Sequence, residues 1–299
     1  HPADDLFNIG PPSVATDVMA EYSKVTVDGT LTTIDFNQTF TDPVVVLGPM
    51  TDSDQEPAEA RIVDVQADQA KVRIERANGG THPDETISYV VAEKGTWNLA
   101  DGTEVEVGTH ALNADNGATE TVGYNRSFSQ KPAVVADTQT VNESTFTITR
   151  QENLTDSGFD VGFQENHNAD QAHVTETLGY IAINPSNSNG TAAGDDGTAF
   201  ETGIQGSAVD RGGGKTLTFD DASLAGDALI AKMATYNGGD EAWSRLSNEN
   251  APTVFIDEDD ADGERNHIGE TISFVGFEGS SGTIEADRAS PPAISVTDV

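Results

Sequence analysis

The chain has 299 residues, and 15 Lys and Arg against 51 Asp and Glu give a formal net charge of −36 at pH 7. So acidic a chain argues against nucleic acid or an anionic membrane as a partner, because binding phosphate requires clustered positive charge. The absence of cysteine excludes disulfides, thiolate metal sites and cysteine nucleophiles.

The first segment, residues 1–17, contains three prolines and is expected to be an extended arm. The chain starts at His1 rather than at methionine, which we interpret as the end left by removal of an export signal. No apolar stretch approaches the roughly 18 residues needed to span a bilayer, so the sequence predicts no membrane insertion.

After the arm, short segments alternate apolar and polar residues, as at residues 71–75 and 159–163. A period of two predicts half-buried β-strands, and Gly, Asn and Asp mark the turns between them. Residues 224–233 fit either a strand or a helix, and no other segment predicts a helix longer than two turns. The predicted fold class is therefore all-β, built from antiparallel β-sandwiches.

One pattern of nine residues occurs three times along the chain. Residues 82–90, 173–181 and 267–275 share H-x-x-E-T-[IL]-[SG]-[YF]-[VI], and the glutamates are 91 and 94 residues apart. An arginine precedes each glutamate by 24 to 26 residues, and D-G-T-x-x-E-x-G occurs at residues 101–108 and 196–203. Motifs that recur in the same order at nearly constant spacing indicate an internal repeat.

The repeat divides the chain into three tandem β-sandwich domains of about 90 residues each. In the last strand of each copy both faces are apolar, which predicts a strand covered on both sides. The predicted segments are an N-terminal arm at 1–17, domains at 18–99, 100–192 and 193–285, and a C-terminal tail at 286–299.

The first copy carries F-x-x-P-V-V-V-L at residues 40–47, A-R-I at 60–62, V-R-I at 72–74 and I-S-Y-V-V-A-E at 87–93. This order of motifs resembles the H-type lectin domain of snail agglutinins and discoidin-like proteins. The resemblance implies a six-stranded antiparallel sandwich that often forms trimers and binds galactose-type sugars in clefts between protomers. It also implies that an arginine of the middle strand and a histidine or tryptophan near the last loop contact the sugar.

The polar residues that recur in all three copies are the candidate glycan-binding residues. They are Arg61, His82, Glu85, Arg150, His173, Glu176, Arg245, His267 and Glu270. Such a set can bind sugar hydroxyls while the aromatic residue of the last strand packs on the sugar ring. In the structural alternative, the arginine and glutamate of each copy pair at the edge of its core and the histidine closes the turn. The parity of the last strand places Glu85 beside Ile87 and Tyr89, which favours this alternative.

The acidic loop at residues 257–263 matches a calcium-binding loop only in part. With Gly263 as the sixth position, the twelfth is Gly269 instead of the required glutamate. We therefore predict no metal and no other cofactor, with calcium between other carboxylate loops left open. The chain also has no nucleophile elbow and no zinc-protease motif, and its carboxylates are too numerous to single out a pair, so we predict no enzymatic activity.

Five N-x-[ST] sequons predict glycosylation, at Asn37, Asn125, Asn142, Asn153 and Asn189. The acidic surplus, with only six lysines, is typical of a protein that stays soluble in concentrated salt, as in an extreme halophile. We therefore expect an extracellular, cell-surface or virion-surface protein. The first hypothesis is attachment through surface glycans. The second is a structural subunit of a filament, viral fibre or surface layer that self-associates, as a trimer or a filament, without binding sugar.

Overall fold

The computed structural model describes residues 17–115, 117–208, 210, 212–224, 227–260 and 263–289. These residues form 22 strands and one short 3-10 helix, η1 (Ala222–Leu224), so the predicted all-β fold class is confirmed. The predicted arm at 1–17 lies outside the described residues except for Asp17, and so does the predicted tail beyond residue 289.

Two sheets form a first sandwich around one core. The larger sheet contains β1 (Asp17–Val27), β7 (Glu85–Glu93) and β3 (Pro43–Leu47), and the smaller contains β2 (Thr32–Asp35), β6 (Gln69–Arg76) and β5 (Ala58–Val65). Alternate residues of the strands, such as Val45, Ile74 and Tyr89, point into the space between the two sheets.

The second and third sandwiches repeat this arrangement. The second joins β8 (Gly95–Asn98), β9 (Glu104–Leu112), β14 (Glu176–Asn184) and β11 (Ala133–Thr138) with β10 (Glu120–Gly123), β13 (Gly158–Glu165) and β12 (Thr147–Glu152). The third joins β15 (Thr191–Ala193), β16 (Ala199–Ala208), β21 (Glu270–Phe277) and β18 (Leu229–Met233) with β17 (Lys215–Thr216), β20 (Thr253–Glu258) and β19 (Ala242–Asn248). A short strand of the first copy, β4 (Met50–Thr51), adds to β19 in parallel. Every other strand pair of the described residues is antiparallel.

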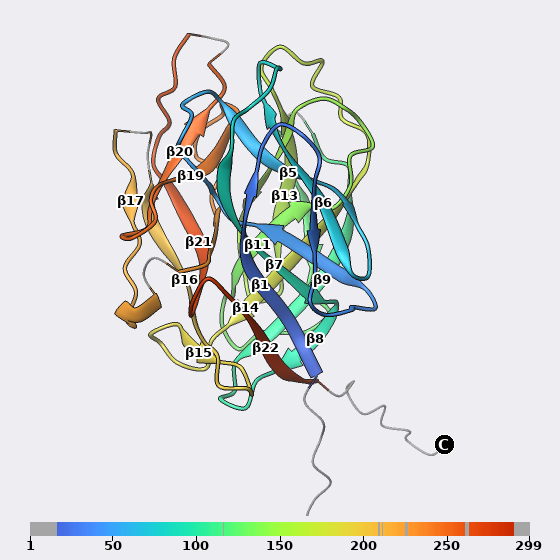
Figure 1. The fold of residues 1–299 in the computed structure, drawn as a ribbon, viewed down its shortest axis with the longest axis vertical. Coiled ribbons are helices and arrows are strands. Elements are labelled where there is room, and N and C mark those ends of the chain that lie inside the picture. The colour runs from blue at the N-terminus through green and yellow to red at the C-terminus, as the bar shows by residue number, and fades with distance from the viewer. Residues whose placement is uncertain are drawn as a thin grey trace, which may run out of the picture.

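The last strand of the chain closes the first sandwich. In the second and third sandwiches the outer strand beside β9 or β16 comes just before it in the chain, as β8 or β15. In the first, the outer strand is β22 (Ser281–Arg288), which pairs with β1 and then, at its end, with β8 (Figure 1). The predicted boundary after residue 285 thus falls inside β22, and the one after residue 99 separates β8 from its partner β9.

A fourth apolar cluster lies where the larger layers of the three sandwiches face one another; β22 and β8 join two of these layers into one eight-stranded sheet. The cluster takes Val90 from β7, Ile181 from β14 and Val275 from β21, while the neighbouring residues of those strands point into their own sandwiches. Burying each such side chain contributes about 1.5–3 kcal/mol. The second apolar face of each last strand is therefore covered within the chain.

Candidate functional site

The nine predicted glycan-binding residues are all buried, and none is more than 5% exposed. They lie at the junctions between sandwiches, and at two of the three junctions the arginine of one sandwich binds the repeated glutamate of the next. This differs from both sequence interpretations: the set offers a sugar little surface, and the arginine–glutamate pairs form between copies rather than within one. The constant spacing shows that these residues recur in each copy, but it does not show which copy supplies the partner of each residue.

At the junction of the second and third sandwiches, Arg150 is fully buried on β12. Its Nη2 donates to Glu270 Oε1 at 3.1 Å and to the carbonyl of Gly238 at 3.2 Å. Its Nη1 donates to Gln164 Oε1 at 2.7 Å and to the carbonyl of Asp240 at 2.9 Å. Burial lowers the pKa of Arg150, and the Glu270 carboxylate opposes that shift. One side chain thus binds the loop before β19 and the start of β21 of the third sandwich to the second.

At the junction of the third and first sandwiches, Arg245 plays the same part from β19. Its Nη2 donates to Glu85 Oε1 at 3.2 Å and to the carbonyls of Thr51 and Asp54 at 2.7 and 2.9 Å. Its Nη1 lies 3.3 Å from Asp257 Oδ2 on the neighbouring strand. The partner of Glu85 therefore lies 160 residues away in the chain instead of 24.

The junction of the first and second sandwiches is different. Arg61 Nη1 donates to Glu75 Oε2 at 2.8 Å and to the carbonyl of Thr145 in the second copy at 2.9 Å. Among the described residues it forms no ion pair with Glu176, whose cationic neighbour is His173, with Nε2 3.3 Å from Glu176 Oε1. Two of the three arginines therefore bind the repeated glutamate of another copy, and the third does not.

Each repeated glutamate also holds a loop of its own copy. In each copy one threonine hydroxyl donates to the repeated glutamate, which is Glu85, Glu176 or Glu270. The backbone N–H two residues after that threonine donates to the same carboxylate. These threonines are Thr51, Thr140 and Thr235. Sequence analysis missed them, although T-x-[NS] precedes each glutamate by 34 to 36 residues. The motif is too short to be noticed without the contacts.

The D-G-T-x-x-E-x-G motif is structural. Glu106 is buried and accepts the backbone N–H groups of Asn125 and Arg126 at 2.9 and 3.0 Å. Gly108 lies against the ring of Tyr180 on β14, where a Cβ would come within 2.3 Å of the ring. Glutamate therefore anchors a loop, and glycine leaves room for the aromatic residue of the last strand.

All five sequon asparagines are exposed, so their glycosylation stays a prediction. Asn37 and Asn125 each donate their side-chain amide to a buried glutamate, at 3.0 and 3.2 Å, and Asn142 donates to the carbonyl of Thr175. Asn153 donates to Asp160 Oδ2 at 2.9 Å. Within the described residues, the Asn189 amide nitrogen makes no hydrogen bond, so a glycan there would displace no contact.

Charged side chains from all three sandwiches meet near the centre of the molecule. Lys232 Nζ lies 2.6 Å from Asp137 Oδ1 and 3.9 Å from Glu59 Oε1. Burial raises the pKa of Glu59 to about 7, and Lys232 only partly offsets this. Burial likewise raises the pKa of Asp137. Asp137 and Lys232 occupy equivalent positions on β11 and β18, beside Gly179 and Ser273 of the last strands. The sequence did not single out this cluster because the residue type at that position differs between the copies.

Carboxylates and histidines that could hold a metal ion gather at one place in the described residues. Glu143, Glu165 and His173 bring their ligand-type atoms within 4.8 Å of one another. The predicted acidic loop is held differently: Asp257 contacts Arg245 and Arg265, and Asp260 accepts a hydrogen bond from Asn78. The part of that loop at residues 261 and 262 lies outside the described residues.

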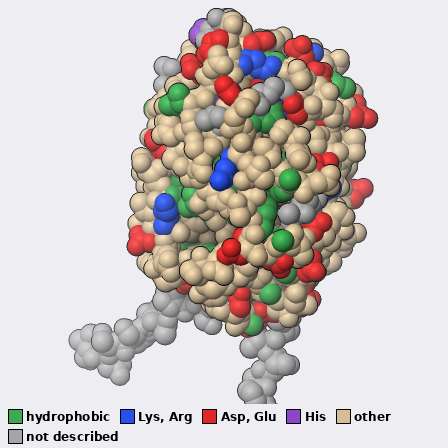
Figure 2. Space-filling view, turned by 90° about the vertical axis from the view of Figure 1, so that its left-hand side faces the viewer, with side chains coloured by type: hydrophobic (Ala, Val, Ile, Leu, Met, Phe, Trp, Pro, Cys, Tyr) green, Lys and Arg blue, Asp and Glu red, His purple; other side chains and the backbone are tan. Residues whose placement is uncertain are grey.

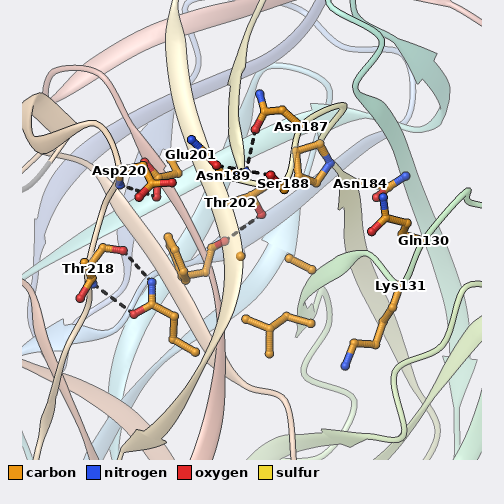
Figure 3. Close-up of a pocket in the computed structure, with 17 residues that line it drawn as sticks. Gln130, Lys131, Asn184, Asn187, Ser188, Asn189, Glu201, Thr202, Thr218 and Asp220 are labelled. Carbon is orange, nitrogen blue, oxygen red and sulfur yellow. Dashed lines mark hydrogen bonds between the residues drawn. The ribbon is translucent and has the colours of Figure 1, made fainter.

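A polar groove of about 440 Å³ opens between the second and third sandwiches (Figure 3). One wall is formed by β16 and Thr218, where Gln205 and Thr218 exchange hydrogen bonds of 2.6 and 3.1 Å. Gln130 and Lys131 stand on the opposite wall, and residues 187–189 form the rim. Amides, hydroxyls and carboxylates can exchange hydrogen bonds with a hydroxyl-rich ligand.

Comparison with known proteins finds one curated relative. The chain is 32% identical over 298 residues to halomucin of Haloquadratum walsbyi, a match that covers 93% of this chain. It spans 3% of the length of halomucin. No family model and no solved structure matches the chain. Among the described residues, no helix has the length and apolar character needed to cross a membrane.

Proposed function

We propose that this chain is a non-enzymatic structural unit of an extracellular or cell-surface protein of an extreme halophile. The similarity to a short part of halomucin supports this, together with the formal charge of −36. Figure 2 shows Asp and Glu side chains spread over one face, with few Lys and Arg among them. In concentrated salt the repulsion between such charges is screened, so the folded chain stays soluble.

The observation that carries the proposal is that repeated polar residues form buried contacts between the sandwiches. Arg150 and Arg245 are fully buried and each binds the next sandwich, while β22 closes the first sandwich with the end of the chain. The apolar faces that favoured self-association are buried in the central cluster, so they no longer favour it. The recurrence of these residues is therefore explained by the contacts that hold the sandwiches together.

Antibodies against the folded protein should label intact cells of the source organism in brine, because the proposal places the unit outside the membrane. Immunofluorescence before and after permeabilisation measures this. An antibody against a cytoplasmic protein, which should label only permeabilised cells, is the control. Labelling that appears only after permeabilisation contradicts the proposal.

Glycan-mediated attachment is a second candidate function, and the polar groove favours it. The resemblance to H-type lectin domains implies sugar clefts between protomers, and the groove lies between the second and third sandwiches, which are equivalent units of this chain. Its lining combines Gln130 and Lys131 on one side with Gln205 and Thr218 on the other, and Phe274 adds an apolar surface. Such a lining suits a short saccharide.

A glycan array probed in multimolar salt tests the groove. The native chain should bind a subset of glycans. The Gln130→Ala/Gln205→Ala variant should weaken binding at least about tenfold, because it removes one amide from each wall and the hydrogen bonds by which Gln205 holds Thr218. Gln66→Ala, which removes an exposed amide outside the groove, should bind like the native chain. Absence of binding by the native chain, or equal binding by both variants, contradicts this function.

A further inference from the structure

We propose that the chain binds one divalent metal ion where the first and second sandwiches meet, through Glu143, Glu165 and His173. Glu165 is the last residue of β13, His173 lies in the loop that leads to β14, and Glu143 lies in the loop after β11. The inference does not depend on the proposed function, because it concerns a site that neither the repeat nor the groove explains.

The distances between the side chains suit shared coordination. His173 Nδ1 lies 2.9 Å from Glu165 Oε1 and 3.8 Å from Glu143 Oε2. With metal–ligand bonds of about 2.1 Å, neighbouring ligand atoms lie roughly 3.0–3.4 Å apart in octahedral or tetrahedral geometry. A small movement of the Glu143 carboxylate, whose side chain is 27% exposed, brings all three atoms to these separations. That exposed side chain also marks the route by which an ion enters.

The second nitrogen of the histidine has the partner that a metal-ligating histidine needs. His173 Nε2 lies 3.3 Å from Glu176 Oε1, and a carboxylate in this position favours the tautomer in which Nδ1 carries no proton and can bind metal. Nδ1 also lies 3.1 Å from the Thr147 hydroxyl, so a bound metal ion takes the place of that hydrogen bond. Glu176 is itself held by the Thr140 hydroxyl at 2.5 Å and the backbone N–H of Asn142 at 2.6 Å. Glu176 therefore orients the ring of His173, and hydrogen bonds to its own loop hold Glu176 in place.

The charge at this junction points to a cation. Glu165 is 1% exposed and its Oε2 has no hydrogen-bond partner among the described residues, which is costly for a buried carboxylate. At the other two junctions an arginine binds the repeated glutamate at 3.1 or 3.2 Å. Here Arg61 is instead engaged by Glu75 and the carbonyl of Thr145. Within the described residues, Glu165 and Glu176 thus have only His173 as a cationic partner.

The corresponding positions in the other two copies do not form this set. Glu143 is matched by Asp54 and Gly238, whose backbone N–H groups likewise donate to the repeated glutamate of their own copies. Glu165 is matched by Arg76 and Glu258, which also end their strands. The first copy therefore has an arginine where a ligand is needed, and the third has a glycine. We expect one ion per chain.

The ligand set selects the class of metal. One imidazole with two carboxylates suits Zn²⁺ or Mn²⁺ better than Ca²⁺ or Mg²⁺, which prefer oxygen ligands alone. A proton is the competing occupant, since an imidazolium could donate to Glu165 and Glu176 at the same time. Metal binding must displace that proton, so the affinity for Mn²⁺ should fall as the pH is lowered.

The test uses the full chain in concentrated KCl after treatment with EDTA. Calorimetry with Zn²⁺ and electron paramagnetic resonance with Mn²⁺ should each report one site per chain. Glu165→Gln should weaken binding at least about 10- to 100-fold, the range seen when groups around a metal are removed. Glu143→Gln, at the exposed side of the site, keeps the test decisive if Glu165→Gln does not fold.

Glu258→Gln is the matched control, because it makes the same change at the equivalent strand end of the third copy. It should bind Mn²⁺ like the native chain, and circular dichroism checks that each variant is folded. The proposal is overturned if the native chain binds neither ion at one site, if Glu143→Gln and Glu165→Gln bind as the native chain does, or if Glu258→Gln loses binding equally.

Discussion

Replacing Arg150 by alanine should destabilise the folded chain by about 3–5 kcal/mol, because it leaves a buried carboxylate without its counter-ion. Both Arg150 and Glu270 have side chains that are 0% exposed. The substitution also removes the hydrogen bonds that the carbonyls of Gly238 and Asp240 accept from the same guanidinium. Salt does little to screen a pair buried this deeply, so the loss should persist in brine.

Chemical unfolding in multimolar salt measures this loss, and Arg61→Ala is the matched comparison. Arg61 is also buried, but Glu75 keeps Arg73 as a partner when Arg61 is removed, so we expect a smaller loss of about 1–3 kcal/mol. Combining Arg150→Met with Glu270→Gln should recover part of the stability that Arg150→Met loses alone. Equal losses for Arg61→Ala and Arg150→Ala would show that the interaction with Glu270 contributes nothing.

The sequence predicts the strands well because their period is local. Alternation at residues 71–75 and 159–163 corresponds to β6 and β13, and the doubly apolar last strands are β7, β14 and β21. The same alternation explains why Glu85 is buried beside Ile87 and Tyr89. Each of these inferences needs only neighbouring residues and the geometry of a pleated strand.

The connections between copies could not be predicted in the same way. Arg61 precedes Glu85 by 24 residues, and nothing in that spacing shows that Glu85 pairs with Arg245 of another copy. A repeat makes pairing within one copy and pairing between copies look alike, because the same residue types recur at each position. The cluster of Glu143, Glu165 and His173 was equally hidden, since two of its three members have no counterpart of the same type in the first copy.

The role of β22 was also beyond sequence reasoning, and it leads to the second prediction. Ending the chain after residue 280 should destabilise it by about 5 kcal/mol or more. Ile284 and Ala286 leave the central cluster, and β1 loses its partner along residues 17–23. Removing a buried isoleucine side chain alone costs about 2–5 kcal/mol, and each lost backbone hydrogen bond adds about 1 kcal/mol.

Thermal unfolding followed by circular dichroism measures this effect, and two further samples show that it belongs to the strand. Ile284→Ala should reproduce part of the loss, whereas Thr283→Ala, on the opposite face of β22, should change stability by less than about 1 kcal/mol. A synthetic peptide of residues 281–289 added to the truncated chain should restore stability, and the gain should rise with the logarithm of the peptide concentration, because the peptide can add to the free edge of β1. The prediction is contradicted if the truncated chain unfolds at the same temperature as the full chain, or if the peptide does not change its unfolding temperature. Either result would show that the sandwiches hold together without β22.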